Sequence, residues 1–233
     1  MKKVSLLICA LLILVSCGTK EENDNKGNNN TSEDKKLESN QEDSNSELNN
    51  DEVIIGSQVW MTKNLNVSTF RNGNPIPEVK TAEEWKEAGD NEQPAWCYYE
   101  NDPANGTKYG KLYNWYAVND PRGLAPEGYH VPTDDEWTIL QDHLGGDAKK
   151  MKSTSGWFDE GNGTDQSGFN GLPGGNRYFD GNFDAIDSHG YWWSSTENAT
   201  DFTWYRGLNF FYDDVDRSNG SKDNGFSVRC LRD

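Results

Sequence analysis

The sequence has few of the residues from which catalytic and metal sites are usually built. Its 233 residues include only four cysteines and three histidines, and the histidines are scattered at positions 130, 143 and 189. It contains no His-Glu-x-x-His, no Cys-x-x-Cys and no glycine-rich phosphate loop followed by lysine. Ser194-Ser195 has neither the glycine elbow nor the identifiable base of a hydrolase nucleophile. These absences argue against zinc, P-loop and serine-hydrolase chemistry, and His130 is predicted to be structural.

Basic residues are also scarce. The chain carries 22 Lys and Arg against 39 Asp and Glu, a net charge of −17. Residues 51–233 alone have 30 acidic and 16 basic side chains, a net charge of −14. Nucleic-acid phosphates and anionic lipid would repel such a domain, so we expect no nucleic-acid partner. The excess acid is typical of a soluble surface, and acidic loops that bind calcium are the alternative.

Long hydrophobic runs are absent beyond the leader. Residues 4–15 form a twelve-residue run broken only by a serine, which follows two lysines and is too short to span a bilayer. This pattern predicts a signal peptide over residues 1–16. The following Leu-Val-Ser-Cys, ending at Cys17, resembles the lipobox of bacterial lipoproteins. The resemblance implies that Cys17 is acylated, with palmitate among its chains, and holds the protein on a membrane. An ordinary secretory peptide with an incidental cysteine is the alternative.

Aromatic residues are missing from residues 18–52. This stretch is mostly Asn, Glu, Asp, Lys and Ser, and it cannot bury enough apolar surface to offset the entropy of ordering. We therefore expect residues 17–52 to be a lipidated cysteine and a disordered acidic tether, reaching roughly 30–35 Å on average. Lys20-Glu21-Glu22 is similar to the short signal that sends lipoproteins of Bacteroidetes-type bacteria to the outer face of the outer membrane. The predicted location is the cell surface, and a periplasm-facing outer-membrane lipoprotein is the alternative.

The best-defined helix signal lies after Pro132. Thr133 and Glu136 have the spacing of a capping box, in which each side chain satisfies the other's backbone N–H. Trp137, Leu140 and Leu144 then fall on one helical face, and a Gly-Gly pair ends the helix. A second capping box at Thr81 predicts a short helix that ends near residue 89.

The remaining pattern predicts an α+β domain over residues 53–233, with short antiparallel strands, two or three helices and long loops. The apolar spacing in residues 109–118 favours a helix, although its aromatic content also suits a strand. Residues 153–190 are predicted to be loop-dominated, and such regions often carry binding sites. Strands are expected in a hairpin at 53–61 and at 94–99, 191–195, 202–210 and 225–231, with a turn at 213–220.

Several motifs run in order through this domain. They are Val-Trp-Met-Thr-Lys-Asn-Leu at 59–65, Tyr-Gly-Lys-Leu-Tyr-Asn-Trp-Tyr-Ala-Val at 109–118, Gly-Tyr-His-Val-Pro-Thr at 128–133, Leu-Pro-Gly-Gly at 172–175, Trp-Trp-Ser-Ser at 192–195 and Gly-Phe-Ser-Val-Arg-Cys-Leu-Arg-Asp at 225–233. Together they resemble the major paralogous domain family named from Fibrobacter succinogenes. The resemblance implies a secreted or lipid-anchored bacterial protein, from a family without an established activity.

A wider resemblance implies a fold. Val-Pro-Thr-Asp-Asp-Glu-Trp at 131–137, with a Gly-Phe…Arg-Cys ending, is similar to the formylglycine-generating, sulfatase-modifying enzymes. Those enzymes share a C-type-lectin-like fold, in which N- and C-terminal strands pair. The resemblance therefore implies that strand 225–231 returns to pair near the first strands.

The sequence lacks the residues that the reaction of those enzymes requires. Formylglycine generation needs a reactive cysteine pair that binds copper, whereas this chain keeps only Cys97 and Cys230 beyond Cys17, with no histidine nearby in sequence. Two cysteines in an exported protein are more simply a disulfide or two buried thiols. We expect no catalytic residue, no cofactor and no enzymatic activity.

One weak metal candidate remains. Asp180, Asn182 and Asp184 place oxygen atoms at alternate positions, as calcium loops do, but the glycine and glutamate of an EF-hand are missing. A solvated turn is the alternative.

Aromatic residues near the long loops suggest a ligand site. Trp192, Trp193 and Tyr205, next to Arg206, would suit stacking on sugar rings, with core packing as the alternative. The sequence thus favours a cell-envelope lipoprotein that displays a non-catalytic domain for glycans or another envelope protein. An enzyme of the sulfatase-modifying type and a purely structural surface protein are the other two hypotheses.

Overall fold

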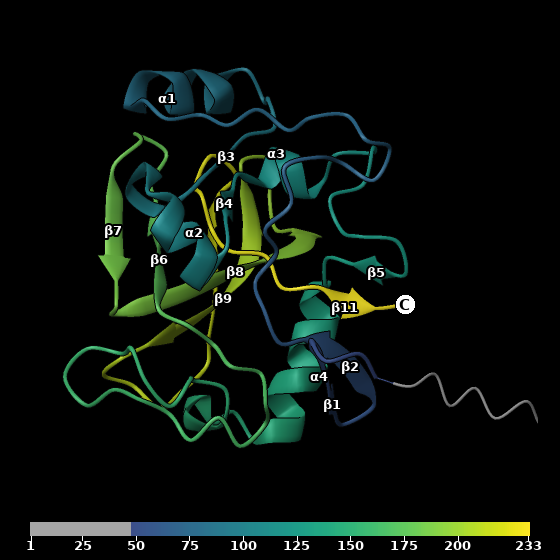
Figure 1. Ribbon diagram of the computed structural model, residues 1–233, viewed down its shortest axis with the longest axis vertical. Helices are drawn as coiled ribbons and strands as arrows, with labels where there is room; N and C mark the ends of the chain where they lie inside the picture. Colours follow the sequence, from purple (N-terminus) through teal and green to yellow (C-terminus); the bar gives the residue numbers. More distant parts are fainter. Residues whose placement is uncertain (1–47) are drawn as a thin grey trace, which may run out of the picture. The chain divides into compact units, whose positions relative to one another are not determined.

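The computed structural model describes residues 48–233, and every structural statement below concerns that part of the chain (Figure 1). The predicted signal peptide, Cys17 and almost all of the predicted tether lie outside the described residues. Within residues 48–233, no helix is both long enough and apolar enough to cross a membrane.

The two ends of the domain meet in a four-stranded antiparallel sheet. Its order is β1-β2-β11-β5, formed by β1 (Glu52–Ile55), β2 (Gln58–Met61), β11 (Leu231–Arg232) and β5 (Tyr129–His130). Leu231 of β11 pairs with Trp60 of β2, and Leu65 N–H donates to Val228 O at 2.8 Å. The expected return of the last strand to the first ones is therefore confirmed, and Figure 1 shows β11 beside β2.

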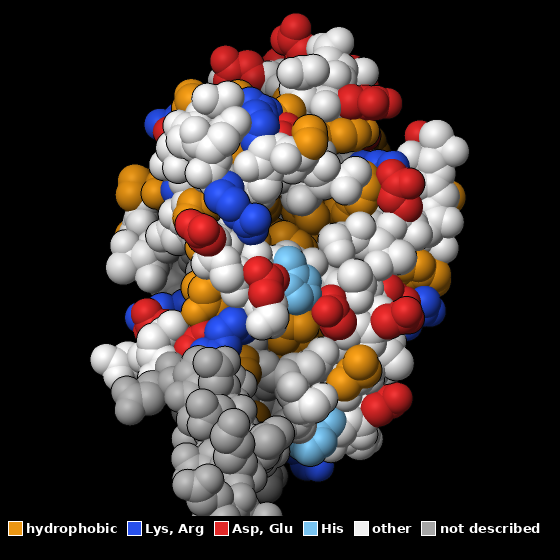
Figure 2. All heavy atoms as spheres, turned by 90° about the vertical axis from the view of Figure 1, so that its right-hand side faces the viewer, with side chains coloured by type: hydrophobic (Ala, Val, Ile, Leu, Met, Phe, Trp, Pro, Cys, Tyr) orange, Lys and Arg blue, Asp and Glu red, His pale blue; other side chains and the backbone are white. Residues whose placement is uncertain are grey.

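His130 joins three parts of this end of the molecule. Its Nδ1 lies 2.7 Å from Asp233 Oδ1, and its Nε2 lies 2.9 Å from Glu136 Oε1. Burial opposes protonation of the ring, but the two carboxylates outweigh it and raise the pKa of His130. Figure 2 views this side of the molecule, where acidic side chains flank a histidine. The ring links β5, the C-terminus and a helix start, which supports the structural role that the sequence predicts.

Helix α4 (Asp134–Leu144) begins and ends as predicted. Both hydrogen bonds of the capping box between Thr133 and Glu136 form, and Gly145 takes the left-handed conformation at the end, with φ of 72°. Trp137 is 1% exposed and its ring centroid lies 4.7 Å from that of Trp60. The helix thus buries its apolar face against residues of both sheets, including Trp60 of β2 and Trp192 of β8.

A five-stranded sheet forms the other half of the fold. Its order is β10-β9-β8-β6-β7, formed by β10 (Asp216–Ser221), β9 (Phe202–Asn209), β8 (His189–Glu197), β6 (Gly174–Arg177) and β7 (Phe183–Ile186). The sheet is antiparallel except where β6 meets β8. Two predictions are corrected here, because β10 occupies most of the predicted turn at 213–220 and β6 and β7 lie in the predicted loop region. Pairing with β9 overrides the weak strand propensity of the Asp-Arg-Ser-Asn-Gly-Ser sequence of β10.

The predicted helix over residues 109–118 is wrong. The stretch instead contains the end of α2 (Pro103–Tyr109), the strand β4 (Leu112–Tyr113) and the short helix α3 (Trp115–Val118). Gly110 ends α2 with φ of 78°, and Leu65 O lies only 2.8 Å from where a Cβ would stand. Helical spacing of the apolar residues was therefore overridden by a glycine that approaches another backbone.

The remaining elements complete the α+β fold. They are α1 (Ala82–Asp90), with its predicted capping box, β3 (Trp96–Cys97), which pairs with β4, and the 3₁₀ turns η1 (Tyr99–Asn101) and η2 (Ala148–Lys150). Residues 48–233 thus hold four α-helices rather than the expected two or three.

Buried arginines hold the irregular segments together. Arg177, Arg206 and Arg229 are each 1% exposed or less. Arg229 donates to the carbonyls of Met61 and Phe169, and burial lowers the pKa of Arg229 to about 9. Because loops leave many carbonyls without a ladder partner, guanidinium groups with five N–H donors replace the missing sheet bonds.

Candidate functional site

The predicted aromatic platform does not form. Trp192 and Trp193 are both 0% exposed, and their indole N–H groups donate to Asn64 Oδ1 and Tyr113 O. Neighbouring strand residues point to opposite faces, and each face of β8 is covered at this point, so neither tryptophan reaches solvent. The prediction that Trp192 and Trp193 bind a ligand is wrong, and the core-packing alternative holds.

Arg206 is also a structural residue. Its side chain is 1% exposed, and its Nη1 donates to Asp134 Oδ1 at 2.6 Å. Arg217, which is 43% exposed, binds the other oxygen of Asp134 at 2.7 Å. The prediction that Arg206 contacts a ligand is therefore wrong. Tyr205 points to the opposite face of β9 and is half-buried, so it alone of the four predicted residues lies near an open surface.

The predicted calcium loop closes on itself. Asp180 accepts hydrogen bonds from the backbone N–H and the side-chain amide of Asn182, at 3.0 and 2.8 Å. Asp184 lies on β7 and accepts from the Tyr178 hydroxyl at 3.4 Å. No group of three or more His, Cys, Asp or Glu side chains suited to a metal ion occurs in residues 48–233. Asp180 and Asn182 thus bond to each other as in a solvated turn, and calcium binding by this loop stays a prediction.

The two cysteines are free thiols. Cys97 and Cys230 are both buried and belong to different hydrophobic clusters. Burial raises the pKa of each thiol to about 12, so neither is a reactive thiolate at neutral pH. The possible disulfide between them is thus contradicted, because both thiols are free and pack in separate clusters. The buried-thiol alternative is the one observed.

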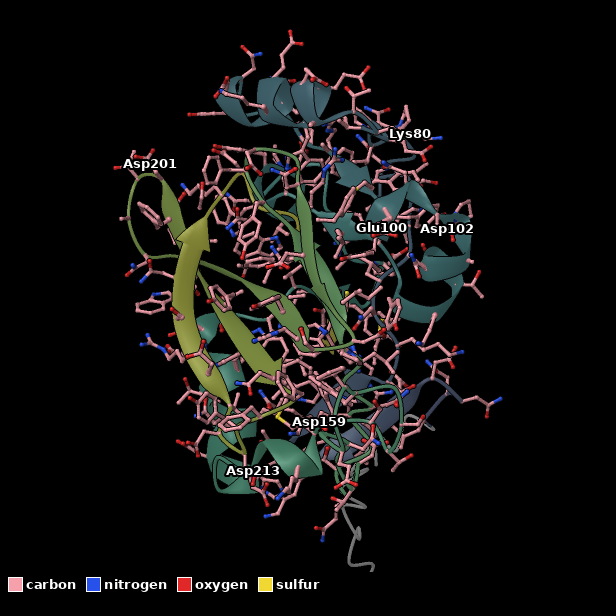
Figure 3. The ribbon with its side chains drawn as sticks, turned by 90° about the vertical axis from the view of Figure 1, so that its left-hand side faces the viewer. Lys80, Glu100, Asp102, Asp159, Asp201 and Asp213 are labelled. Carbon is pink, nitrogen blue, oxygen red and sulfur yellow. The ribbon has the colours of Figure 1, made fainter. Side chains whose placement is uncertain are left out.

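The pocket with the most suitable chemistry lies where β9 passes into β10. It encloses about 450 Å³ and is lined by Asn209, Tyr212, Asp214, Val215 and Asp216. One aromatic ring, one amide and two carboxylates therefore face a shared space. Asp213, labelled in Figure 3, marks this end of the β9–β10 pair, and Asp201 marks the opposite end.

A buried lysine fixes the shape of this pocket. Lys152 is 1% exposed, and its Nζ donates to Asn209 O at 3.1 Å and to Tyr212 O at 3.3 Å. Burial lowers the pKa of Lys152, although Asp213, 3.9 Å away, partly offsets this effect. Asn209 Oδ1 in turn accepts from the N–H groups of Phe211 and Tyr212. The loop is therefore held in one conformation before any ligand arrives.

A chain of ring contacts leads away from Tyr212, which lines the pocket. Phe211 is 71% exposed, while Tyr212 and Phe158 are each 61% exposed. The rings of Phe211 and Tyr212 meet edge to face at 5.0 Å, and Phe158 meets the half-buried Phe210 at 5.4 Å. We call Phe158, Phe211 and Tyr212 the aromatic rim. Contiguous exposed aromatic surface of this kind marks interaction sites in soluble proteins.

The pocket opens onto one face of the five-stranded sheet. Figure 3 looks onto this sheet from the side opposite α4. We call this surface the tyrosine face and define it by Tyr178, Tyr191, Tyr205, Asp184 and Asp216. Burial, the largest effect, and the nearby phenols and carboxylates raise the pKa of Tyr191, so its hydroxyl stays protonated. Asp216 belongs to both the pocket and this face, which makes the two surfaces continuous.

The sequence contains one signal for this site. Residues 210–212 are three successive aromatics, and alternation along an extended chain turns at least one of them outward. Asp213 and Asp214 follow directly, and charged side chains of this kind indicate that the segment faces solvent. Local pattern predicts only a strand that ends at residue 210 and a turn from residue 213, because the contacts of this loop with Lys152 are not visible in the sequence.

Comparisons with known proteins identify the family. A family model described as the Fibrobacter succinogenes major domain matches residues 53–232. No curated protein and no solved structure matches the chain. The C-type-lectin-like arrangement accordingly stays a prediction.

Proposed function

We propose that this chain, which belongs to the Fibrobacter succinogenes major domain family, is a cell-envelope lipoprotein that displays a non-catalytic glycan-binding domain. The observation that carries the proposal is the preorganised pocket between β9 and β10, with its exposed aromatic rim. A partner protein of the envelope is the alternative occupant.

The chemistry of the pocket suits a sugar. The ring of Tyr212 offers an apolar surface for the C–H face of a pyranose, while carboxylate oxygens of Asp214 and Asp216 accept hydrogen bonds from hydroxyl groups. No hydrogen bond or ion pair within residues 48–233 engages either carboxylate, so both are available. Because the domain carries net negative charge, we expect neutral rather than anionic glycans.

The absence of catalysis is part of the proposal. The pocket lining includes no histidine, cysteine or serine, so no base–nucleophile pair faces its space. Carboxylate pairs do hydrolyse glycosides in some enzymes, so the binding assay includes a search for shortened products. Release of such products would overturn the non-catalytic assignment.

The first residues of the sequence support display on the outer membrane. The lipobox-like ending at Cys17 and the acidic tether support a lipid anchor that holds the domain away from the bilayer, at the cell surface or facing the periplasm. The antiparallel return of β11 to β2 supports a C-type-lectin-like arrangement. Cys17→Ser should release the protein from membranes, and retention of this variant in the membrane fraction would contradict lipidation.

A glycan array probed with the chain from residue 18 onward tests the binding proposal. Neutral glycans should bind, equally with and without a chelator. Tyr212→Ala should weaken binding roughly thirtyfold, which corresponds to about 2 kcal/mol for an aromatic hot spot. Phe202→Ala is the matched control, because Phe202 is 44% exposed at the opposite end of β9. Equal loss in both variants, or no binding to any glycan, would refute the proposal.

A further inference from the structure

We infer that the ligand is an extended, uncharged oligosaccharide that runs from the pocket across the tyrosine face to Tyr178 and Asp184. This inference rests on the proposed function and adds the length, charge and path of the glycan. It assigns binding roles to side chains on β6, β7 and β8, far from the pocket in sequence.

The register of the sheet makes the path continuous. Asp216 of β10 pairs with Gly207 of β9, and Gly207 pairs with Tyr191 of β8. Beyond β8 lie β6 and then β7, which carries Asp184. Four inter-strand spacings of about 4.8 Å separate the two outer carboxylates by roughly 19 Å on a flat sheet, and by less on a curled one. A span of this size is longer than a single sugar and calls for an oligosaccharide.

Gly207 lies in the middle of this path and adds no side chain to the surface. The glycine is buried between Tyr191 and Asp216, and the atoms nearest to a Cβ there would be those of the Asp216 and Tyr205 side chains, at 3.4 to 3.6 Å. A small side chain would therefore fit, so sterics within the fold do not require glycine at this position. Because Gly207 itself is buried, a ligand on this path would meet the flanking Tyr205 and Asp216 side chains rather than the backbone of β9.

The tyrosine face presents phenol hydroxyl groups to a ligand, because the rings of Tyr191 and Tyr205 pack against neighbouring rings. The ring of Tyr191 stacks with His189 at 5.6 Å and with Phe226 at 5.0 Å, and the ring of Tyr205 meets Phe226 edge-on. Within residues 48–233, the hydroxyl of Tyr191 makes no hydrogen bond to another side chain or to the backbone. Phenols that can both donate and accept match a ligand rich in hydroxyl groups, whereas an apolar ligand would leave them unpaired.

An unpaired acceptor supports the far end of the path. Asn176 is 1% exposed, pairs with Asp184 across the β6–β7 ladder, and has a side-chain oxygen without a hydrogen-bond donor. Its amide contacts the hydroxyl of Tyr178, which is 41% exposed and holds Asp184 only through a 3.4 Å bond. The unpaired Asn176 oxygen thus belongs to a side chain that contacts the exposed Tyr178 at the far end of the path. Filling a buried, unpaired acceptor is favourable, because leaving it unpaired costs about 1–3 kcal/mol.

The charge of the face selects an uncharged or cationic ligand over an anionic one. The arginines of these strands lie elsewhere: Arg206 and Arg217 bind Asp134 of α4, and Arg177 lies over Trp85 of α1. The carboxylates at both ends of the path are thus not offset by a guanidinium on the same face. The density of hydroxyl partners favours a neutral saccharide over a cation.

Calorimetric titration with oligosaccharides of one to four units tests the inference. The probes are the β-1,4-linked series of glucose, N-acetylglucosamine and mannose, and the protein is the chain from residue 18 onward. Affinity should rise with chain length. Asp184→Asn, an isosteric change at an exposed position, should leave binding of the shortest bound probe unchanged and weaken binding of the longest about tenfold. Tyr191→Phe should act in the same way.

Asp201→Asn is the matched control, since Asp201 is an exposed carboxylate at the other end of β9 and β10. Affinity that does not grow with length, or equal loss for all lengths in Asp184→Asn, would overturn the extended path while leaving binding in the pocket intact. Spermine that binds more tightly than any sugar would overturn the neutral ligand. No binding of any saccharide by the unmodified chain would instead refute the proposed function.

Discussion

Asp134 provides the sharpest test of how this fold is held together, because it neutralises a buried guanidinium. Its carboxylate accepts from Arg206 at 2.6 Å and from Arg217 at 2.7 Å. Arg206 is 1% exposed, and its Nε already lacks a partner within residues 48–233. Replacing Asp134 with alanine would leave this charge buried and unpaired between α4 and β9.

The size of the effect follows from burial. Removing one partner of a buried ion pair costs about 3–5 kcal/mol, because the other charge stays desolvated. The exposed Arg217 adds no more than about 1 kcal/mol. A domain with a free energy of unfolding of about 5–15 kcal/mol would lose roughly a fifth or more of its stability. Asp134→Ala combined with Arg206→Met removes both charges and should restore much of the loss.

The same reasoning fixes the pH dependence. Burial opposes ionisation of Asp134, but Arg217 and Arg206 outweigh it and hold the pKa of this carboxyl below its usual value of 3.8. A lowered folded-state pKa means that the stabilisation is present above about pH 4 and is lost as the pH falls through the folded-state value. The difference between the unmodified chain and Asp134→Ala should therefore shrink in acid.

Urea unfolding followed by circular dichroism measures these quantities at neutral and acid pH. Asp134→Ala should lower the midpoint at neutral pH, and the double variant should regain part of it. A single variant within about 1 kcal/mol of the unmodified chain would refute the reasoning. A double variant as unstable as the single one would show that the buried charge is not the cause.

Three further predictions concern other parts of the domain. The pKa of His130 is raised in the folded state, so the stabilisation by its charge is full below about pH 6.5 and is lost as the pH rises through the folded-state value. His130→Gln should therefore lower the free energy of unfolding more at about pH 5.5 than at about pH 8.5, by up to about 1 kcal/mol for this partly exposed ring. Equal losses at the two pH values would contradict the charge pairing of His130 with Asp233 and Glu136. Lys152→Met should speed amide hydrogen exchange in residues 209–215 and weaken glycan binding several-fold, since two loop carbonyls lose their donor; unchanged exchange would show that the lysine does not fix the pocket. Without reductant, Cys97 and Cys230 should both react with a thiol reagent after denaturation and not before, and absence of thiols in the denatured chain would establish a disulfide.

Elements whose signals are local were predictable from the sequence. The capping boxes at Thr81 and Thr133 each act within four residues, and both helices begin where these boxes place them. The return of the last strand to the first was expected from the wider resemblance to the sulfatase-modifying enzymes and not from any local signal. The structure confirms it through the pairing of Leu231 with Trp60.

The binding residues were not predictable, because their exposure depends on what covers each face of a sheet. Trp192 and Trp193 point in opposite directions, yet one meets the core beside α4 and the other meets Phe226, so alternation exposed neither. The pocket depends on Lys152, which lies some sixty positions from the carbonyl of Tyr212 that it binds. No pattern in a single sequence links two such residues.

Chemical-shift mapping by NMR tests the central claim most directly. The chain from residue 18 onward, labelled with ¹⁵N, would be titrated with the neutral oligosaccharide that the array selects. The account predicts that the largest shifts fall on residues 209–216, with smaller ones on the strands of the tyrosine face. Shifts that cluster on α1 or on the four-stranded sheet, or the absence of any shift at saturating sugar, would contradict it.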